Sequence, residues 1–405
     1  MGETETTAST TETAGRRVIL VLTLANFFLF LGAGAQQQFL VSYLGDLTGW
    51  NAELRASIVA ALYFSMMIFR VGNVWLLRRW SDRTQSAVGS LTYTGFCLAM
   101  VLFFFQPSYP LALASALIWG WGGAALWAGS SLQVLAATDR GRSQYGSTIG
   151  LLYTATHLGF TFGVIGLGLL YGRLGRESLY LVYVAAAAVS LGGNIVLLTT
   201  PRLDHVAPET PSLRSLIEVL SRSKVQVAGF LQFAAALSFG LMLGSFGDMI
   251  KTPYGKQWIW ILAAPYPLAR LIWSWASGAI SDRLGRAWAL AGSFIVVALA
   301  LAGCAIWSNR ATISVAAAAL GLLSTSVPVI ASAIVGDSAD RERRPLAYGS
   351  LFTFRDAGVV LATMAGSILR SQLGDFRLVF LSFAGIFLVC GLISVVLERW
   401  AEQKL

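Results

Sequence analysis

The stretch that decides the fold reads Arg70-Val-Gly-Asn-Val-Trp-Leu-Leu-Arg-Arg-Trp-Ser-Asp-Arg83, and a related stretch reads Arg270-Leu-Ile-Trp-Ser-Trp-Ala-Ser-Gly-Ala-Ile-Ser-Asp-Arg283. The two stretches align without a gap, so that Arg70 falls on Arg270 and the Ser-Asp-Arg endings fall on each other. Each copy places one arginine inside an apolar run and an Asp-Arg pair just beyond the end of that run. A repeat with a period of about 200 residues indicates that the chain consists of two related halves.

The composition indicates an α-helical membrane protein. Hydrophobic residues make up 56% of the 405 residues, charged residues only 12%, and the mean hydropathy is +0.67. Apolar runs of about 20 residues, the length that a helix needs to cross the hydrocarbon core, recur along the whole chain. We therefore predict an all-α, polytopic fold with twelve transmembrane helices at residues 17–44, 54–79, 86–106, 109–135, 147–171, 178–200, 225–250, 256–280, 287–307, 311–335, 347–370 and 376–397.

The twelve predicted helices form two groups of six. The polar, proline-containing segment 201–224 separates them and is predicted to be a cytoplasmic linker. The first six-helix bundle then spans residues 17–200, and the second spans residues 225–397. The Thr- and Glu-rich residues 1–16 are predicted to be a disordered cytoplasmic tail, and residues 398–405 a second cytoplasmic tail. Matching halves with a positive charge inside each are typical of secondary transporters.

Lysine and arginine outside the predicted spans lie mainly on one side of the membrane. Eighteen lie on the side that holds both termini and the linker, and eight lie on the other side. By the positive-inside rule both termini are cytoplasmic, and we expect a multi-pass protein of the cell (inner or plasma) membrane. This bias also explains the net charge of +9, so the charge does not require a nucleic-acid partner.

No common signature of an enzyme or a metalloprotein stands out. Cys97, Cys304 and Cys390 lie in apolar runs without metal-ligand spacing, which favours packed, reduced thiols. We find no clear Gly-rich nucleotide loop, HExxH pattern or catalytic triad. We therefore expect no enzyme activity, no cofactor and no metal site.

One segment of the second half resembles a known family motif. Gly278-Ala-Ile-Ser-Asp-Arg-Leu-Gly-Arg286 is similar to the cytoplasmic loop motif that follows spans 2 and 8 in the major facilitator superfamily. The copy in the first half is degraded, because Arg78 replaces the first glycine and the x-Gly-Arg ending is lost. The resemblance implies two six-helix bundles that alternate access, with the motif holding the cytoplasmic side closed. The predicted gating residues are Asp82, Arg83, Asp282, Arg283 and Arg286; the alternative is a solvated loop whose arginines only set the topology.

Arg70 and Arg270 are the candidate substrate ligands. Arg70 lies eight residues before Arg78, which places it about 12 Å deeper along a helix. A guanidinium at this depth costs at least about 2.5–3.5 kcal/mol unless it faces a wet cavity or a partner. By the symmetry of the halves, the two guanidinium groups are expected to converge on a central cavity. There they can bind a small planar anion, such as a carboxylate or nitrate, through paired hydrogen bonds. Structural ion pairs and snorkelling towards the interface are the alternatives.

The family resemblance sharpens the anion hypothesis. In the superfamily, nitrate/nitrite porters carry substrate-binding arginines in spans 2 and 8 at this offset from the loop motif. Monocarboxylate and oxalate/formate transporters use an arginine in span 8. Arg70 and Arg270 match these positions, but the Gly/Asn-rich signatures of nitrate porters in spans 5 and 11 are missing, so nitrate is only one candidate.

Further polar residues inside the predicted spans complete the candidate site. Gln37, Tyr153 and His157 are predicted to line the cavity; packing is the alternative for each, and proton coupling is a further alternative for His157. Gln37 is flanked by two more glutamines, and those that do not bind substrate are expected near the outer surface. Arg355 and Asp356 are predicted to form a cytoplasmic-side charge network, with proton carriage by Asp356 or substrate contact by Arg355 as alternatives.

Together these features predict a secondary transporter that moves a small anion by alternating access. Asp356 is the only deep acidic residue, so anion exchange, substrate-carried protonation and a coupling proton are all open as the drive. The alternatives are proton-driven efflux of drugs or metabolites and a non-transporting sensor or scaffold. The expected partners are the anion, the proton in one of these schemes and the lipid bilayer; monomers are usual in the superfamily.

Overall fold

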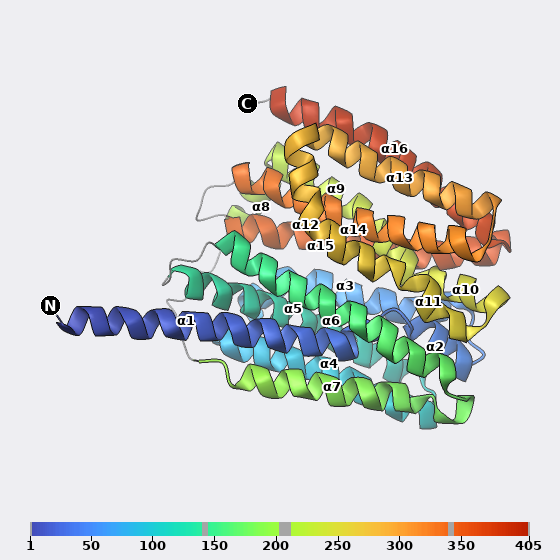
Figure 1. Ribbon diagram of the computed structural model, residues 1–405, viewed down its shortest axis with the longest axis horizontal. Helices are drawn as coiled ribbons and strands as arrows, with labels where there is room; N and C mark the ends of the chain where they lie inside the picture. The colour runs from blue at the N-terminus through green and yellow to red at the C-terminus, as the bar shows by residue number, and fades with distance from the viewer. Residues whose placement is uncertain (1, 140–144, 202–211, 339–343, 404–405) are drawn as a thin grey trace.

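The computed structural model describes residues 2–139, 145–201, 212–338 and 344–403, and every element in these ranges is a helix (Figure 1). The first half contains α1 (Gly2–Leu29), the π-helix η1 (Phe30–Gly34), α2 (Leu40–Leu47), α3 (Ala52–Leu76), α4 (Asp82–Phe105), α5 (Tyr109–Asp139), α6 (Tyr145–Arg173), η2 (Arg176–Ser178) and α7 (Tyr180–Leu198). The short helix α8 (Leu213–Leu220) follows. The second half contains α9 (Ser223–Leu241), the π-helix η3 (Met242–Phe246), α10 (Gly247–Tyr254), η4 (Lys256–Trp258), α11 (Ile259–Ala263), α12 (Pro265–Leu284), α13 (Arg286–Ile306), α14 (Arg310–Ser338), α15 (Arg344–Leu373) and α16 (Phe376–Gln403). The predicted all-α fold is confirmed.

Eleven helical segments in the described parts of the chain are long and apolar enough to cross a membrane. The predicted eighth span, residues 256–280, is not among them; it is divided into η4, α11 and α12. The division falls where Pro265, which lacks a backbone N–H, follows Ala264. The helix α12 carries Arg270 and packs against α14 within the second half, so this half still contains six long helical segments.

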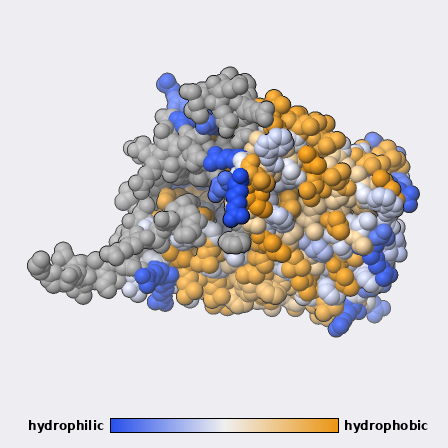
Figure 2. Space-filling model, turned by 45° about the horizontal axis from the view of Figure 1, so that its top comes forward, coloured by the Kyte–Doolittle hydropathy of each residue, from blue (hydrophilic) through white to orange (hydrophobic). Residues whose placement is uncertain are grey.

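The surface of the molecule matches a lipid environment. Leu102, Phe105, Leu299 and Val396 are each more than 60% exposed. Figure 2 shows that apolar residues cover the broad middle of the face in view, while hydrophilic residues gather towards its two ends. A soluble protein rarely exposes an apolar band of this size, so the exposed side chains fit contact with acyl chains.

The two halves lie side by side, and several helix pairs connect them. In Figure 1 the blue-to-green first half lies below the yellow-to-red second half, and both ends of the chain lie at the same end of the bundles. Across the boundary α3 packs against α15, α6 packs against α12, and α2 packs against α10. The predicted ligands Arg70 and Arg270 lie on α3 and α12, so both belong to this boundary.

Two helices fall within segments that the predicted domain division treats as tail or linker. The helix α1 begins at Gly2, within segment 1–16, whose disorder stays a prediction. The predicted linker contains α8, whose N-cap Ser212 accepts a hydrogen bond from the backbone N–H of Ser215. Residues 202–211 of this linker and the last two residues of the C-terminal tail lie outside the described residues.

Candidate functional site

Arg70 is bound to an acidic residue of the other half. Its Nε donates a hydrogen bond to Oδ2 of Asp356, so α3 of the first half is joined to α15 of the second. The Arg70 side chain is only 8% exposed and that of Asp356 is 0% exposed. The guanidinium also lies 3.3 Å from the sulfur of Met66 and 4.9 Å from the ring centre of Phe352. This ion pair is therefore fully enclosed between the halves.

Arg270 has neutral partners. Its Nη2 lies 3.1 Å from Nε2 of His157 on α6, so this contact also joins the two halves. The rings of Phe160, Phe239 and Tyr266 surround the guanidinium, with centres 5.3–5.8 Å from its central carbon. The buried Nε of Arg270 makes no hydrogen bond to the described residues, and no carboxylate of that set lies within ion-pair distance. Arg270 thus retains both its charge and an unused donor.

Arg355 is the third arginine of this region. It lines a small cavity of about 10 Å³ together with Arg270, and the other lining residues are Gln232, Ala236, Phe239, Ser324 and Pro328. Nη1 of Arg355 lies 3.9 Å from Oδ1 of Asp356. A cavity of this volume accommodates about one water molecule, so a larger solute requires the site to widen.

The charges around this cavity do not balance. Among the described residues, Arg70, Arg270 and Arg355 contribute three positive charges, whereas Asp356 contributes one negative charge. Uncompensated guanidiniums in a region shielded from water are costly, and a nearby anion relieves this cost. The arrangement is therefore suited to holding an anion.

The structure corrects one prediction about this region. Arg70 and Arg270 do not face each other across an open cavity, because each contacts a partner in the opposite half. Arg355, predicted for a charge network with substrate contact as the alternative, lines the cavity with Arg270. Asp356, predicted for the same network, pairs with Arg70, and the role of this network stays a prediction. The sequence repeat predicts the corresponding positions of Arg70 and Arg270 but does not predict which residue each arginine contacts.

The other predicted cavity residues lie close by. The carbonyl Oε1 of Gln37 accepts a hydrogen bond from the hydroxyl of Tyr63 on α3. Tyr153 stacks on Trp127 with ring centres 5.2 Å apart and lies 6.5 Å from the ring of His157. The two glutamines beside Gln37 are buried as well, and their expected position near the outer surface of the membrane stays a prediction. The helix is interrupted there by turn residues 37–39, and both flanking amides lack hydrogen-bond partners among the described residues.

The predicted gating residues lie at the end of the molecule opposite the α2–α3 turn. Asp82 is buried in the first turn of α4, and Arg83 donates a 2.6 Å hydrogen bond to the carbonyl of Leu198 in the same half. In the second half Asp282 and Arg283 are exposed in the last turn of α12, and half-buried Arg286 begins α13. Gly285 between these helices has φ +83°, a conformation that favours glycine. The gating role of these residues stays a prediction.

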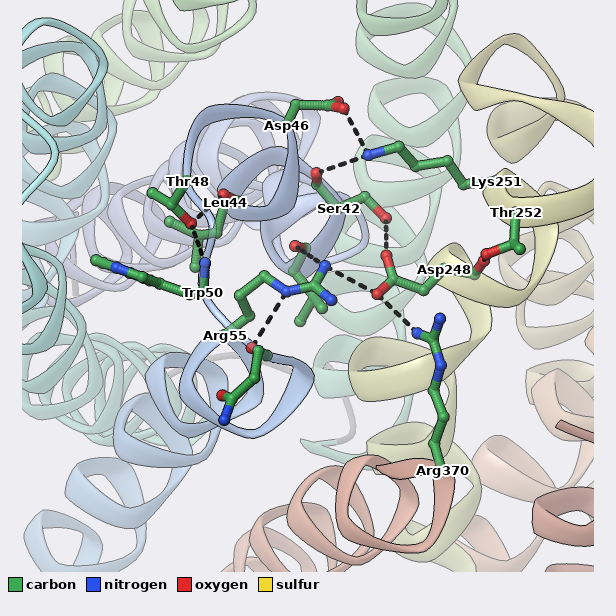
Figure 3. A network of polar contacts seen from close by, with 12 residues as sticks. Ser42, Leu44, Asp46, Thr48, Trp50, Arg55, Asp248, Lys251, Thr252 and Arg370 are labelled. Carbon is green, nitrogen blue, oxygen red and sulfur yellow. Dashed lines mark hydrogen bonds and ion pairs between the residues drawn. The ribbon is translucent and has the colours of Figure 1, made fainter. Parts of the chain in front are cut away.

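A polar network that we did not predict closes the other end of the boundary (Figure 3). Asp248 on α10 forms ion pairs with Arg55 on α3 at 2.8 Å and with Arg370 on α15 at 3.0 Å. Ser42 donates a 3.3 Å hydrogen bond to the same carboxylate. Asp46 on α2 accepts from Lys251 on α10 at 2.5 Å. These contacts connect the halves at the end that the positive-inside rule assigns to the outside.

A sequence signal for this network existed. Asp46 and Asp248 each follow a glycine at the end of the first span of their half, and loop capping is a sufficient explanation for either one taken alone. The signal was the symmetric placement itself, combined with Arg55 and Arg370 on the same side of the membrane. The sequence did not reveal that these residues meet, because they lie on four different helices.

Comparison with known proteins agrees with this architecture. The family model of the Major Facilitator Superfamily matches residues 22–275 and 228–402, which together cover most of the chain. The chain belongs to the Major Facilitator Superfamily. The expected family resemblance is confirmed, and the protein is a multi-pass membrane protein of a transporter family with the fold of that superfamily.

Individual members of the superfamily are similar to parts or to the whole of the chain. Multidrug resistance protein MdtG of Citrobacter koseri (strain ATCC BAA-895 / CDC 4225-83 / SGSC4696) is 32% identical over 122 residues, which is 30% of this chain and 30% of that protein. The crystal structure of the nucleoside transporter NupG matches with a TM-score of 0.73 and 12% identity, over 94% of this chain and 99% of that one. A mutant of the same nucleoside transporter matches with a TM-score of 0.72 and 13% identity, over the same shares of the two chains. At this identity the two structures establish the fold alone.

Proposed function

We propose that this protein is a secondary transporter that moves a small anion, either an organic carboxylate or a nitrate- or nitrite-like ion, by alternating access. The observation that carries the proposal is the excess of positive charge at the boundary of the halves, where three partly buried arginines lie near one carboxylate. Among the described residues, Arg270 in particular has an unused Nε donor and only neutral partners. A bound anion lowers the energy of this arrangement, whereas a cation raises it.

In the proposed cycle, the described state is closed towards the outside. Asp248 and Asp46 hold the outer ends of the two halves together. Opening this end requires the ion pairs to separate, while the loop-motif residues at the other end close the cytoplasmic side. Both termini and the linker then lie in the cytoplasm of a protein in the cell membrane, as the distribution of lysine and arginine predicts.

The ion pair between Arg70 and Asp356 offers two ways of coupling transport to a source of energy. A solute anion that takes Arg70 as its partner leaves the carboxylate of Asp356 buried without its ion pair. Uptake of a proton by Asp356 removes that cost, so anion and proton move together in this scheme. If Arg70 keeps Asp356 throughout the cycle, the solute binds at Arg270 and Arg355 alone, and exchange of one anion for another becomes the drive.

A second candidate function is proton-driven efflux of drugs or metabolites. The partial similarity to a protein named for multidrug resistance supports it. The rings of Phe160, Phe239 and Tyr266 around Arg270 also offer an apolar surface that a larger organic solute can contact. The acid that such efflux requires is Asp356, which is already occupied by Arg70.

A thermal-shift screen of the purified protein separates the two functions. The probes are formate, lactate, oxalate, nitrate, nitrite, phosphate and cationic drugs, and a ligand at one hundred times its dissociation constant adds about 2.7 kcal/mol to the stability. Stabilisation by one anion class, lost in Arg270→Ala but kept in the control Arg377→Ala on an exposed site, supports anion transport. Stabilisation only by drugs, unchanged in Arg270→Ala, overturns it. Uptake of the stabilising solute into proteoliposomes then distinguishes a transporter from a sensor.

A further inference from the structure

Each of two carboxylates of the second half lies between an arginine of α3 and an arginine of α15. At the outer end Asp248 binds Arg55 and Arg370 at 2.8 and 3.0 Å. At the centre Asp356 binds Arg70 and lies 3.9 Å from Arg355. Both the α3 pair and the α15 pair are separated by fifteen residues, or about 22 Å along a helix. The central arrangement is therefore repeated at the outer end.

Arg55 is held in position by its own half. Its Nε donates to the carbonyl of Asn51 and its Nη1 donates to the carbonyl of Val41, both at 3.3 Å. Gly45 leaves room for it, because a Cβ there would lie 2.3 Å from Nη1. Its side chain is only 12% exposed. Since every one of these contacts lies within the first half, the guanidinium keeps its orientation when the halves separate at the outer end.

The partner that Arg55 loses on opening is a carboxylate. Asp248 belongs to the second half and remains with Arg370, which belongs to that half as well. We therefore expect the open state to leave Arg55 oriented and without Asp248, about 22 Å along α3 from Arg70. A carboxylate of a solute has the same charge and the same two acceptor oxygens as Asp248.

We propose that Arg55 is an outer capture site for a small carboxylate, and that Asp248 is the internal carboxylate that occupies this site in the closed state. The inference rests on the proposed anion transport and adds to it a second binding position and a substrate class. The solute binds Arg55 first and then moves along α3 to Arg70 and the central arginines. The return of Asp248 to Arg55 competes with the solute and closes the outer end behind it.

The test measures the KM for external lactate and formate in right-side-out vesicles for two variants that break the same ion pair. Arg55→Gln removes the capture site and is expected to raise the KM about tenfold, the effect of losing one charge-assisted hydrogen bond. Asp248→Asn removes the competitor, keeps Arg55 and is expected to lower the KM. If the ion pair acts only as a latch, both variants favour opening and shift the KM in the same direction, which overturns the inference.

Two further variants serve as controls for this experiment. Gly45→Ala keeps both charges but displaces the guanidinium of Arg55, and it is expected to raise the KM in the same direction as Arg55→Gln. Arg377→Gln removes an exposed positive charge at the same end and is expected to leave the KM unchanged. An equal rise of the KM in this control attributes the effect to long-range electrostatic attraction of the anion and overturns the capture site. Absence of carboxylate uptake in the unmodified protein refutes the proposed function itself, whereas uptake with an unchanged KM in Arg55→Gln refutes the capture site alone.

Discussion

Arg70 and Arg270 occupy the same position of two related halves, yet they have opposite surroundings. Arg70 is neutralised by the fully buried carboxylate of Asp356. Arg270 contacts the neutral or protonatable ring of His157 and three aromatic faces, and it keeps an unused donor. The two halves therefore hold a positive charge at matching positions, and each half balances that charge in a different way.

This difference assigns different tasks to the two arginines. An ion pair enclosed between the halves contributes to holding them together, and breaking it leaves a charge without a partner. An arginine among neutral groups contributes no ion pair to the stability of the fold, and its positive charge is available to bind a ligand. We therefore expect changes at Arg70 to act mainly on stability and changes at Arg270 mainly on binding.

The largest effect is expected for Asp356→Asn. This change leaves Arg70 buried without its carboxylate, and loss of one partner of a buried pair costs about 3–5 kcal/mol. Thermal unfolding of the purified protein measures the loss. In the double variant with Arg70→Gln the total loss should be clearly smaller than the sum of the single losses. Additive losses contradict a direct pair.

Arg270→Gln is expected to affect binding before stability. Removal of a charge-assisted hydrogen bond weakens anion binding by about 10- to 100-fold, since such a bond contributes about 1.5–3 kcal/mol. The melting temperature without ligand should stay near that of the unmodified protein, because no carboxylate depends on Arg270 among the described residues. Titration with the anion found in the screen measures the affinity. A melting temperature that falls as far as in Asp356→Asn removes the distinction between the two arginines.

His157 tests how Arg270 is positioned. In His157→Leu the Nη2 of Arg270 loses the acceptor that lies 3.1 Å away, at a cost of about 1–3 kcal/mol for a buried unsatisfied donor. His157→Gln retains an acceptor and should stay close to the unmodified protein in thermal unfolding. Equal melting temperatures for the leucine and glutamine variants indicate that the contact with Arg270 carries no stability.

The smallest loss of stability is expected for Gln37→Leu, which removes a hydrogen bond between two neutral side chains. It removes the acceptor of the Tyr63 hydroxyl, and a hydrogen bond between neutral groups contributes about 0.5–1.5 kcal/mol. The pairing variant Gln37→Leu with Tyr63→Phe should recover part of the loss, because no donor is left unsatisfied. Chemical denaturation reports both values. A loss as large as that of Asp356→Asn assigns Gln37 a role beyond this hydrogen bond.

Features that depend on local composition and spacing could be predicted from the amino-acid sequence alone. Apolar runs set the helices, and the repeat of Arg70 at Arg270 set the two halves and the depth of their charges. The loop motif ending at Arg286 was sufficient to indicate the family.

Which charged residues contact each other depends on how the helices pack in three dimensions. Arg70 and Asp356 are 286 residues apart, and Arg270 and His157 are 113 residues apart, so no local pattern relates them. The partner of a side chain depends on how its helix is rotated and on which helix of the other half packs against it. Periodicity reports the depth of a residue along its own helix and carries no information on that neighbour. For the same reason the outer network around Asp248 became visible only once α3, α10 and α15 were placed together.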